Sequence, residues 1–95
     1  MQISITSTRP TNEQIPQIEQ FLGTFLPRVR KFPGVLSVYH YYRPSHGDSY
    51  TVIILESDYA LKCYRESNLF TEALEFQKML NLPGTREDYP LIVSL

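Results

Sequence analysis

His40 is the residue of this chain best suited to acid–base chemistry. It lies in residues 35–43, a run of β-branched and aromatic residues that is typical of a strand. A neutral strand histidine in a dry pocket can act as a general base and take the proton of a phenol. The alternative is a histidine that only forms hydrogen bonds within the sheet or at an interface. His46 lies in a Pro/Gly loop, where we expect it to be solvated.

Tyrosines are frequent around His40. They occupy the same strand, the next strand and the following helix: Tyr39, Tyr41, Tyr42, Tyr50 and Tyr64. Each combines apolar area with one hydroxyl, which suits a pocket that orients an aromatic ligand and suits a dimer interface equally well. By alternation Tyr42 shares a face with His40, whereas Tyr39 and Tyr41 point to the opposite face. Tyr42 and Tyr64 are therefore candidate ligand-binding residues.

Composition argues against several classes of function. The single cysteine, Cys63, allows no internal disulfide, and zinc-type Cys/His spacing is absent, so we expect neither a metal nor another cofactor. The net charge of −1 and the lack of a basic run argue against nucleic acid as a partner. No segment has the roughly 20 apolar residues of a membrane span, and residues 1–10 do not resemble a signal peptide. We expect a cytoplasmic protein.

The elements that would position these side chains follow from hydrophobic periodicity. Residues 2–6 alternate and predict a short strand. Thr11 and Gln14 have capping-box spacing and predict the start of a helix, in which Pro27 would cause a bend before the end near Lys31. Its apolar stripe consists of Ile15, Ile18, Leu22, Phe25 and Val29.

Residues 35–43 and 49–56 predict an antiparallel hairpin around a Pro/Gly loop. We expect His40 to share a face with Leu55. The expected pairs are Arg43 with Asp48, His40 with Thr51 and Leu36 with Leu55.

The C-terminal half predicts a helical region and a last strand. Ser57 or Asp58 would cap the helix, and the Ser67-Asn68 pair would interrupt it. Pro83-Gly84 would end this region, and residues 89–95 would form the strand. The order βαββαβ predicts one α+β domain over residues 1–95, with a ferredoxin-like, four-stranded antiparallel sheet and helices on one face.

The predicted sheet is apolar on both faces. Continuous apolar stretches at 35–36, 52–55 and 91–93 leave no strict alternation. Helices would cover one face only, and soluble monomers rarely expose a large apolar patch. We therefore expect a homodimer in which two sheets pack face to face.

Residues 33–76 resemble the antibiotic biosynthesis monooxygenase-like family of dimeric α+β barrels. The resemblance rests on the segments 32–35 (FPGV), 55–61 (LESDYAL) and 64–67 (YRES). Family members include cofactor-independent monooxygenases acting on polycyclic phenols and haem-degrading enzymes, with a pocket between sheet and helices. Many carry a tryptophan where this chain has Leu55, and haem-degrading members carry a helix histidine where it has Leu69 and Phe70. The second difference argues against haem binding.

The resemblance implies a cofactor-independent monooxygenase, an oxidoreductase acting on a small aromatic or polyketide-like substrate. His40 would be the catalytic base. The substrate-binding residues would be Tyr42, Thr51, Leu55, Tyr64 and Phe70. Two alternatives stay open. One is a non-catalytic small-ligand-binding module, and the other is a structural dimer whose pocket is filled by its own Phe and Tyr side chains.

Overall fold

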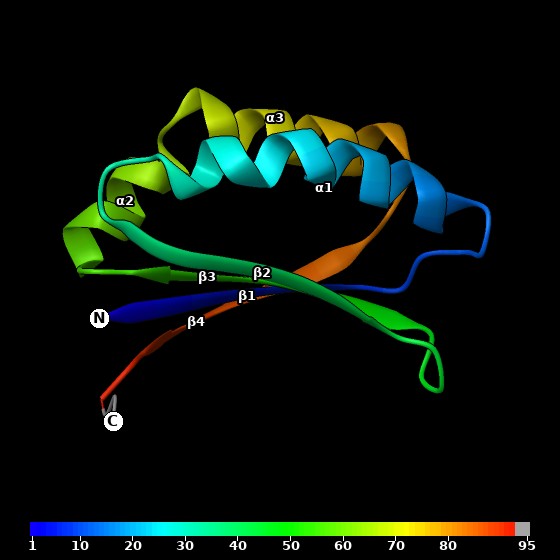
Figure 1. Ribbon diagram of the computed structural model, residues 1–95, viewed down its shortest axis with the longest axis horizontal. Helices are drawn as coiled ribbons and strands as arrows, with labels where there is room; N and C mark the ends of the chain where they lie inside the picture. Colours follow the sequence, from blue (N-terminus) through cyan, green and yellow to red (C-terminus); the bar gives the residue numbers. More distant parts are fainter. Residues whose placement is uncertain (93–95) are drawn as a thin grey trace.

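The computed structural model describes residues 1–92 (Figure 1). Its strands are β1 (Gln2–Thr8), β2 (Val35–Arg43), β3 (Asp48–Leu55) and β4 (Gly84–Pro90). Its helices are α1 (Gln14–Arg30), α2 (Asp58–Arg65) and α3 (Asn68–Met79). The strands form one antiparallel sheet in the order β2-β3-β1-β4. The predicted ferredoxin-like fold is confirmed.

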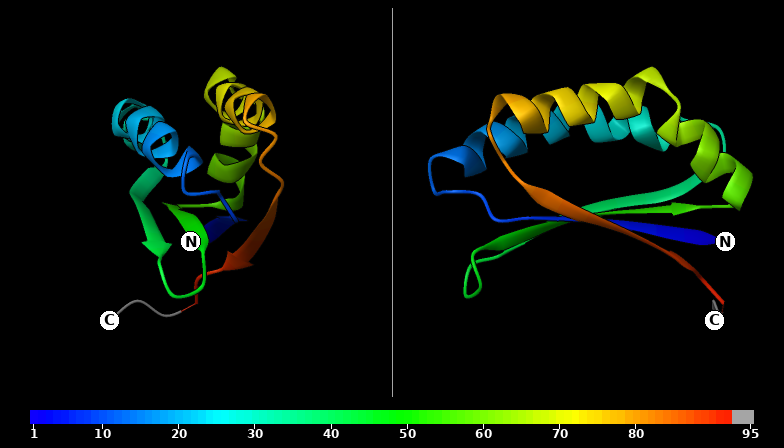
Figure 2. Two further views of the ribbon diagram at one scale, coloured as in Figure 1. Left: turned by 90° about the vertical axis from the view of Figure 1, so that its right-hand side faces the viewer. Right: turned by 180° about the vertical axis from the view of Figure 1, so that it is seen from behind.

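The helices cover one face of the sheet and leave the other uncovered. Helices α1 and α3 lie side by side above the strands in the views of Figures 1 and 2. The core forms where α1 and α2 meet β2 and β3. Its buried residues are Phe25, Val29, Val35, Ile53, Leu55, Ala60 and Tyr64.

The start of α1 has the predicted capping box. The backbone N–H of Thr11 donates to Gln14 Oε1 at 2.9 Å, and the backbone N–H of Gln14 donates to Thr11 Oγ1 at 3.3 Å. The helix continues through Pro27 to Arg30, with Lys31 as its C-terminal cap. Pro27 is on the exposed side, where water can reach the Gly23 carbonyl that loses its helical partner.

Two serines define the starts of α2 and α3, as expected. Ser57 Oγ accepts a hydrogen bond from the Ala60 N–H at 3.1 Å, and Ser67 Oγ accepts one from the Phe70 N–H at 3.3 Å. A capping hydroxyl satisfies an N–H that has no partner within the helix. The break at Ser67 therefore begins a new helix whose first turn carries Phe70.

The hairpin register is confirmed at its loop end and wrong at the other end. Arg43 pairs with Asp48, and His40 pairs with Thr51. Leu55 pairs with Val35 instead of Leu36, because Leu36 is the extra residue of a β-bulge. The bulge buries Val35 and leaves Leu36 39% exposed.

The predicted last strand is also wrong in its position. Strand β4 is Gly84–Pro90, and it pairs with β1 along its whole length. It is an edge strand with one neighbour, where charged residues are tolerated. The apolar pattern that predicted a strand at 89–95 therefore does not identify β4. Residues 93–95 lie outside the part of the chain that the structure describes.

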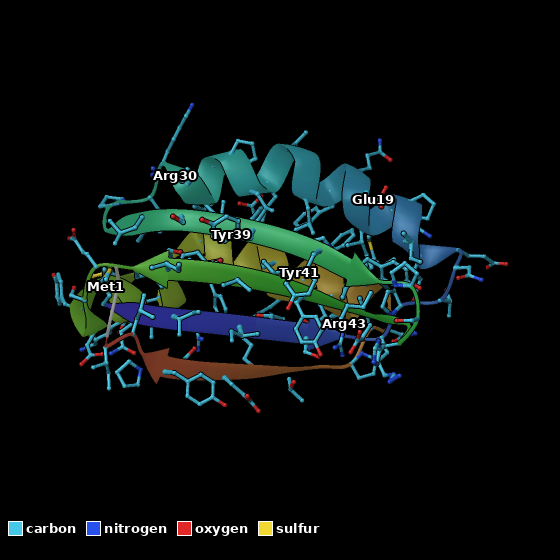
Figure 3. All side chains as sticks on the ribbon, turned by 60° about the horizontal axis from the view of Figure 1, so that its bottom comes forward. Met1, Glu19, Arg30, Tyr39, Tyr41 and Arg43 are labelled. Atoms are coloured by element: carbon cyan, nitrogen blue, oxygen red, sulfur yellow. The ribbon has the colours of Figure 1, made fainter. Side chains whose placement is uncertain are left out.

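Both faces of the sheet carry apolar residues, as expected, but neither is apolar throughout. The uncovered face carries Tyr39 and Tyr41, which are 55% and 48% exposed (Figure 3). Alternation along the paired strands puts apolar neighbours beside them: Ile3, Ile5, Val52, Ile54 and Tyr89. The helix-facing side is apolar near Leu55 but carries hydroxyls toward the hairpin loop. Each face is therefore apolar over part of its area: the helix-facing side around Leu55, and the uncovered side around Val52, with Glu87 and the Arg43–Asp48 pair at its margins.

Candidate functional site

The strand registers align helix-facing residues into rows that cross all four strands. One of them, here called the polar row, consists of His40 (β2), Thr51 (β3), Thr6 (β1) and Arg86 (β4). The next row toward the loop consists of Tyr42, Ser49, Thr8 and Gly84. The ladder hydrogen bonds hold these side chains in fixed order, so the sheet is a rigid platform for them.

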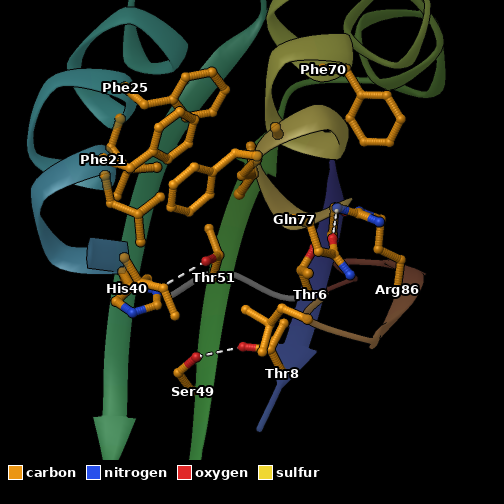
Figure 4. A pocket seen from close by; sticks show the side chains of 18 of the residues that line it. Thr6, Thr8, Phe21, Phe25, His40, Ser49, Thr51, Phe70, Gln77 and Arg86 are labelled. Atoms are coloured by element: carbon orange, nitrogen blue, oxygen red, sulfur yellow. Dashed lines mark hydrogen bonds between the residues drawn. The ribbon is translucent and has the colours of Figure 1, made fainter. Parts of the chain in front are cut away.

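A cavity of about 90 Å³ lies between the polar row and helices α1 and α3 (Figure 4). Its floor is mostly hydroxylic, formed by Ser4, Thr6, Thr8, Ser49 and Thr51. Its roof is apolar, formed chiefly by Ile18, Phe21, Leu22, Phe25, Phe70, Ala73 and Phe76. One water needs roughly 10–15 Å³ by the same measure, so the cavity holds several waters or a small ring, and a larger ligand must reach beyond it.

Stacked aromatic rings hold the roof together. The rings of Phe21 and Phe76 are parallel within 4°, with centroids 4.0 Å apart, and join α1 to α3. Phe25 stacks on Phe21 at 4.8 Å, and Phe70 meets Tyr64 edge-on at 5.6 Å. Such surfaces favour a flat apolar ligand, while the hydroxyls below can bind its polar groups.

His40 forms the β2 end of the cavity. Its Nδ1 lies 2.9 Å from Thr51 Oγ1 (Figure 4). Burial lowers the pKa of His40, while the Glu19 carboxylate opposes that shift. The imidazole is therefore neutral at pH 7. If Nδ1–H donates to Thr51, Nε2 keeps a lone pair that can accept a proton from a ligand.

The cavity meets an outer groove beside His40. The groove has a volume of about 240 Å³ and shares Ile18, His40 and Ser49 with the cavity. Tyr42 and Glu19 also line it. A ligand too large for the cavity has room to extend in this direction.

The predicted site residues fall into three places. Thr51, Tyr64 and Phe70 line the cavity together with His40. Tyr42 lines the outer groove. Leu55 does not line the cavity, because its fully buried side chain belongs to the core at the other end of the sheet. The prediction that Leu55 contacts a ligand is therefore not supported by its position.

Tyr64 is a deeply buried phenol at the cavity wall, with 3% of its surface exposed. Burial raises its pKa, while the positive charges of Arg86 and Arg65 oppose the shift. The phenol therefore stays protonated at neutral pH and can serve as a hydrogen-bond donor.

Apart from Thr51, sequence reasoning missed the hydroxyls of the floor, and it also missed Arg86. Ser4, Thr6 and Thr8 recur every second residue, a pattern that could have indicated a polar face of β1. The hydroxyls of Thr8 and Ser49 lie 2.7 Å apart across β1 and β3. Arg86 gave no such signal, because its segment was expected to be a loop.

Two features are absent from residues 1–92. No three His, Cys, Asp or Glu side chains come together in a way that could hold a metal ion. Nor does this part of the chain contain a helix long and apolar enough to cross a membrane.

No protein-family model matches the chain, and no curated protein matches it by sequence. Solved structures do match. A proposed antibiotic biosynthesis monooxygenase from Deinococcus radiodurans superposes with a TM-score of 0.90 at 18% identity, covering 100% of this chain and 96% of the other. A similar proposed monooxygenase from Nitrosomonas europaea gives 0.84 at 7% identity, covering 98% and 100%. The protein Rv0793 from Mycobacterium tuberculosis gives 0.82 at 16% identity, covering 98% and 96%. The chain therefore has the fold of the antibiotic biosynthesis monooxygenase-like proteins.

Proposed function

We propose that the protein is a cofactor-independent monooxygenase that acts on a small aromatic phenol in the cavity between the sheet and α1 and α3. The observation that carries the proposal is His40, a half-buried, neutral histidine held by Thr51 at the wall of a cavity with an aromatic roof. The names of the structural neighbours support the same class of reaction.

The proposed reaction needs no added reductant. His40 Nε2 takes the phenolic proton, and the electron-rich anion transfers electrons to dioxygen and forms a carbon–oxygen bond to it. The resulting peroxide takes the proton back from His40, and water is then lost as its O–O bond and the C–H bond of the same ring carbon break. One oxygen atom remains on the ring as a carbonyl, and the other leaves as water. The substrate supplies all four electrons that reduce dioxygen, and the cavity excludes bulk water from the anion.

Oxygen uptake with hydroquinone or anthrone as substrate tests this function, with autoxidation in protein-free buffer subtracted. Labelled dioxygen should place one oxygen atom in the product. His40→Gln should lower kcat about 100-fold or more, the usual contribution of a general base. The matched control is His46→Gln, since His46 is exposed on the hairpin loop. Equal loss in both variants, or no uptake above autoxidation, would reject the proposal.

A non-catalytic ligand-binding protein is the second candidate. The observation that favours it is the small cavity, about 90 Å³ beneath four phenylalanine side chains. Binding of a phenol without oxygen uptake would support this candidate. The structural alternative, a dimer whose cavity is filled by its own side chains, requires that no phenol binds at all.

We also propose that the protein is a homodimer through the uncovered face of the sheet. Support comes from the apolar residues of that face and from the exposure of its tyrosines. Exposed apolar patches of this kind commonly mark interfaces.

A further inference from the structure

Arg86 is a half-buried cation at the β4 end of the polar row (Figure 4). Its guanidinium donates one hydrogen bond, from Nη2 to Gln77 Oε1 at 3.0 Å. A guanidinium has five N–H donors in a planar fork. The ion pairs found among residues 1–92 all use other arginines. Arg86 therefore has donors and a positive charge available to a ligand.

A second arginine lies close by but has a counter-ion. The guanidinium carbons of Arg65 and Arg86 each lie 5.1 Å from the centroid of the Phe70 ring. Arg65 donates to Asp88 Oδ1 and, at 2.9 Å, to Ser4 Oγ. Burial lowers the pKa of Arg86 and the charge of Arg65 lowers it further, while Tyr64 and Asp88 oppose the shift. Arg86 remains protonated at neutral pH. A bound anion would offset both the cost of burying its charge and the repulsion from Arg65.

The charge around the cavity is asymmetric. A second open groove of about 420 Å³ lies between α3 and β4, and it shares Gln77, Leu82 and Arg86 with the cavity. Lys78 also lines this groove, and neither the groove nor the cavity has an Asp or Glu among its described lining residues. The groove beside His40 contains Glu19 instead. The field therefore favours an anion at the Arg86 end.

We propose that the Arg86 end of the cavity binds the carboxylate of a small aromatic acid, with the ring lying over Thr6 and Thr51 toward His40. The proposal deepens the proposed function and rests on it for the choice of cavity. A carboxylate matches the planar fork of the guanidinium and can accept two hydrogen bonds from it. Neighbouring strands are about 4.8 Å apart, so one ring with its carboxylate spans the middle of the polar row.

Benzoate and benzamide provide a matched pair of probes, because they have nearly the same size and differ in charge. Each is titrated into the nitrogen-15-labelled protein without oxygen, and the amide shifts of Thr6, Thr51 and Arg86 are followed. We expect benzoate to bind about tenfold more tightly or better, the usual effect of a charge-assisted hydrogen bond. Arg86→Gln should remove this preference, and Arg86→Lys should retain only part of it, because an ammonium keeps the charge but lacks the planar fork. Arg28→Gln changes the net charge equally on the exposed surface and should leave the preference unchanged.

Equal affinity for the two probes, no binding of benzoate, or an unchanged preference in Arg86→Gln would overturn the anion site. Thermal unfolding of each variant checks that it is folded. If Arg86→Gln does not fold, the preference of Arg86→Lys for benzoate decides the test. The readout does not depend on turnover. A preference for benzoate without oxygen uptake would support the anion site and reject the proposed enzyme. Oxygen uptake without the preference would support the enzyme and reject the anion site.

Discussion

His40 and Arg86 occupy the two ends of one row of neighbouring residues that crosses all four strands. Thr51 and Thr6 lie between them, on β3 and β1. A group that can take a proton and a group that can hold an anion are thus placed at opposite ends of one cavity floor. This arrangement predicts that a ligand is bound in one orientation, with its anion toward β4.

The pH dependence of the reaction should report His40. Because burial lowers its pKa below the ordinary value of 6.5, the ring stays neutral to lower pH than a free histidine. The neutral ring is the base, so kcat/KM should rise with pH and level off, with a midpoint below 6.5. The Glu19 carboxylate stabilises the charged ring, so Glu19→Gln should move the midpoint to still lower pH.

Proton NMR titration of the His40 ring should give the same midpoint, which separates its ionisation from that of the substrate. Glu13→Gln, at the exposed start of α1, is the matched control and should leave the midpoint unchanged. A rate that does not vary between about pH 5 and 8 would contradict the role of His40 as base.

Arg65 should act on benzoate binding through Asp88. In Arg65→Gln, Asp88 loses its partner and becomes a counter-ion for Arg86, whose pKa it already raises. Benzoate affinity should fall several-fold, and the double variant Arg65→Gln/Asp88→Asn should recover it. Benzamide affinity should change little in either protein. A loss that the double variant does not recover would show that Arg65 acts by another route, such as its bond to Ser4.

Gly84 should be needed for the close approach of β4 to β1 and to the Gln77 side chain of α3. A Cβ at this position would lie 2.7 Å from the Ser7 carbonyl oxygen and 3.0 Å from Gln77 Nε2. Gly84→Ala should therefore lower the free energy of unfolding by about 1–3 kcal/mol and displace Gln77, the partner of Arg86. Gly23→Ala is the control, because nothing lies within 4 Å of its Cβ on the exposed side of α1. It should raise stability by about 0.5–1 kcal/mol in urea unfolding, and a Gly84→Ala protein of equal stability would refute the argument.

Local chemistry explains which features could be predicted from the sequence. Thr11 with Gln14, and Ser67 before α3, form caps whose partners are three residues away, and the structure has both. The pairing of His40 with Thr51 follows from placing Arg43 opposite Asp48, a register that the loop length alone does not determine. The bulge at Leu36 could not be predicted in this way, because it depends on how β2 packs against the helices.

The site residues also divide into those that local sequence patterns predict and those that depend on tertiary structure. Strand alternation puts His40 and Thr51 on one face, and the family resemblance puts the pocket between that face and the helices. Alternation also suggested Leu55, which shares their face but lies too far along β3, under the buried part of α1. Arg86 could not be predicted, because the edge strand that carries it has no apolar pattern and is recognised only by its pairing with β1.

The uncovered face of the sheet should be the dimer interface. Val52 lies at its centre, paired with Ile5 on one side and Tyr39 on the other. A stable interface buries about 800 Å² per partner, and in a symmetric dimer Val52→Lys would put two unpaired charges into it. Sedimentation velocity should show a dimer for the native protein and a folded monomer for Val52→Lys at micromolar concentration. Thr24→Lys, on the exposed side of α1, should remain a dimer. A native protein that sediments as a monomer would exclude the interface, and a Val52→Lys dimer would place it elsewhere on the molecule.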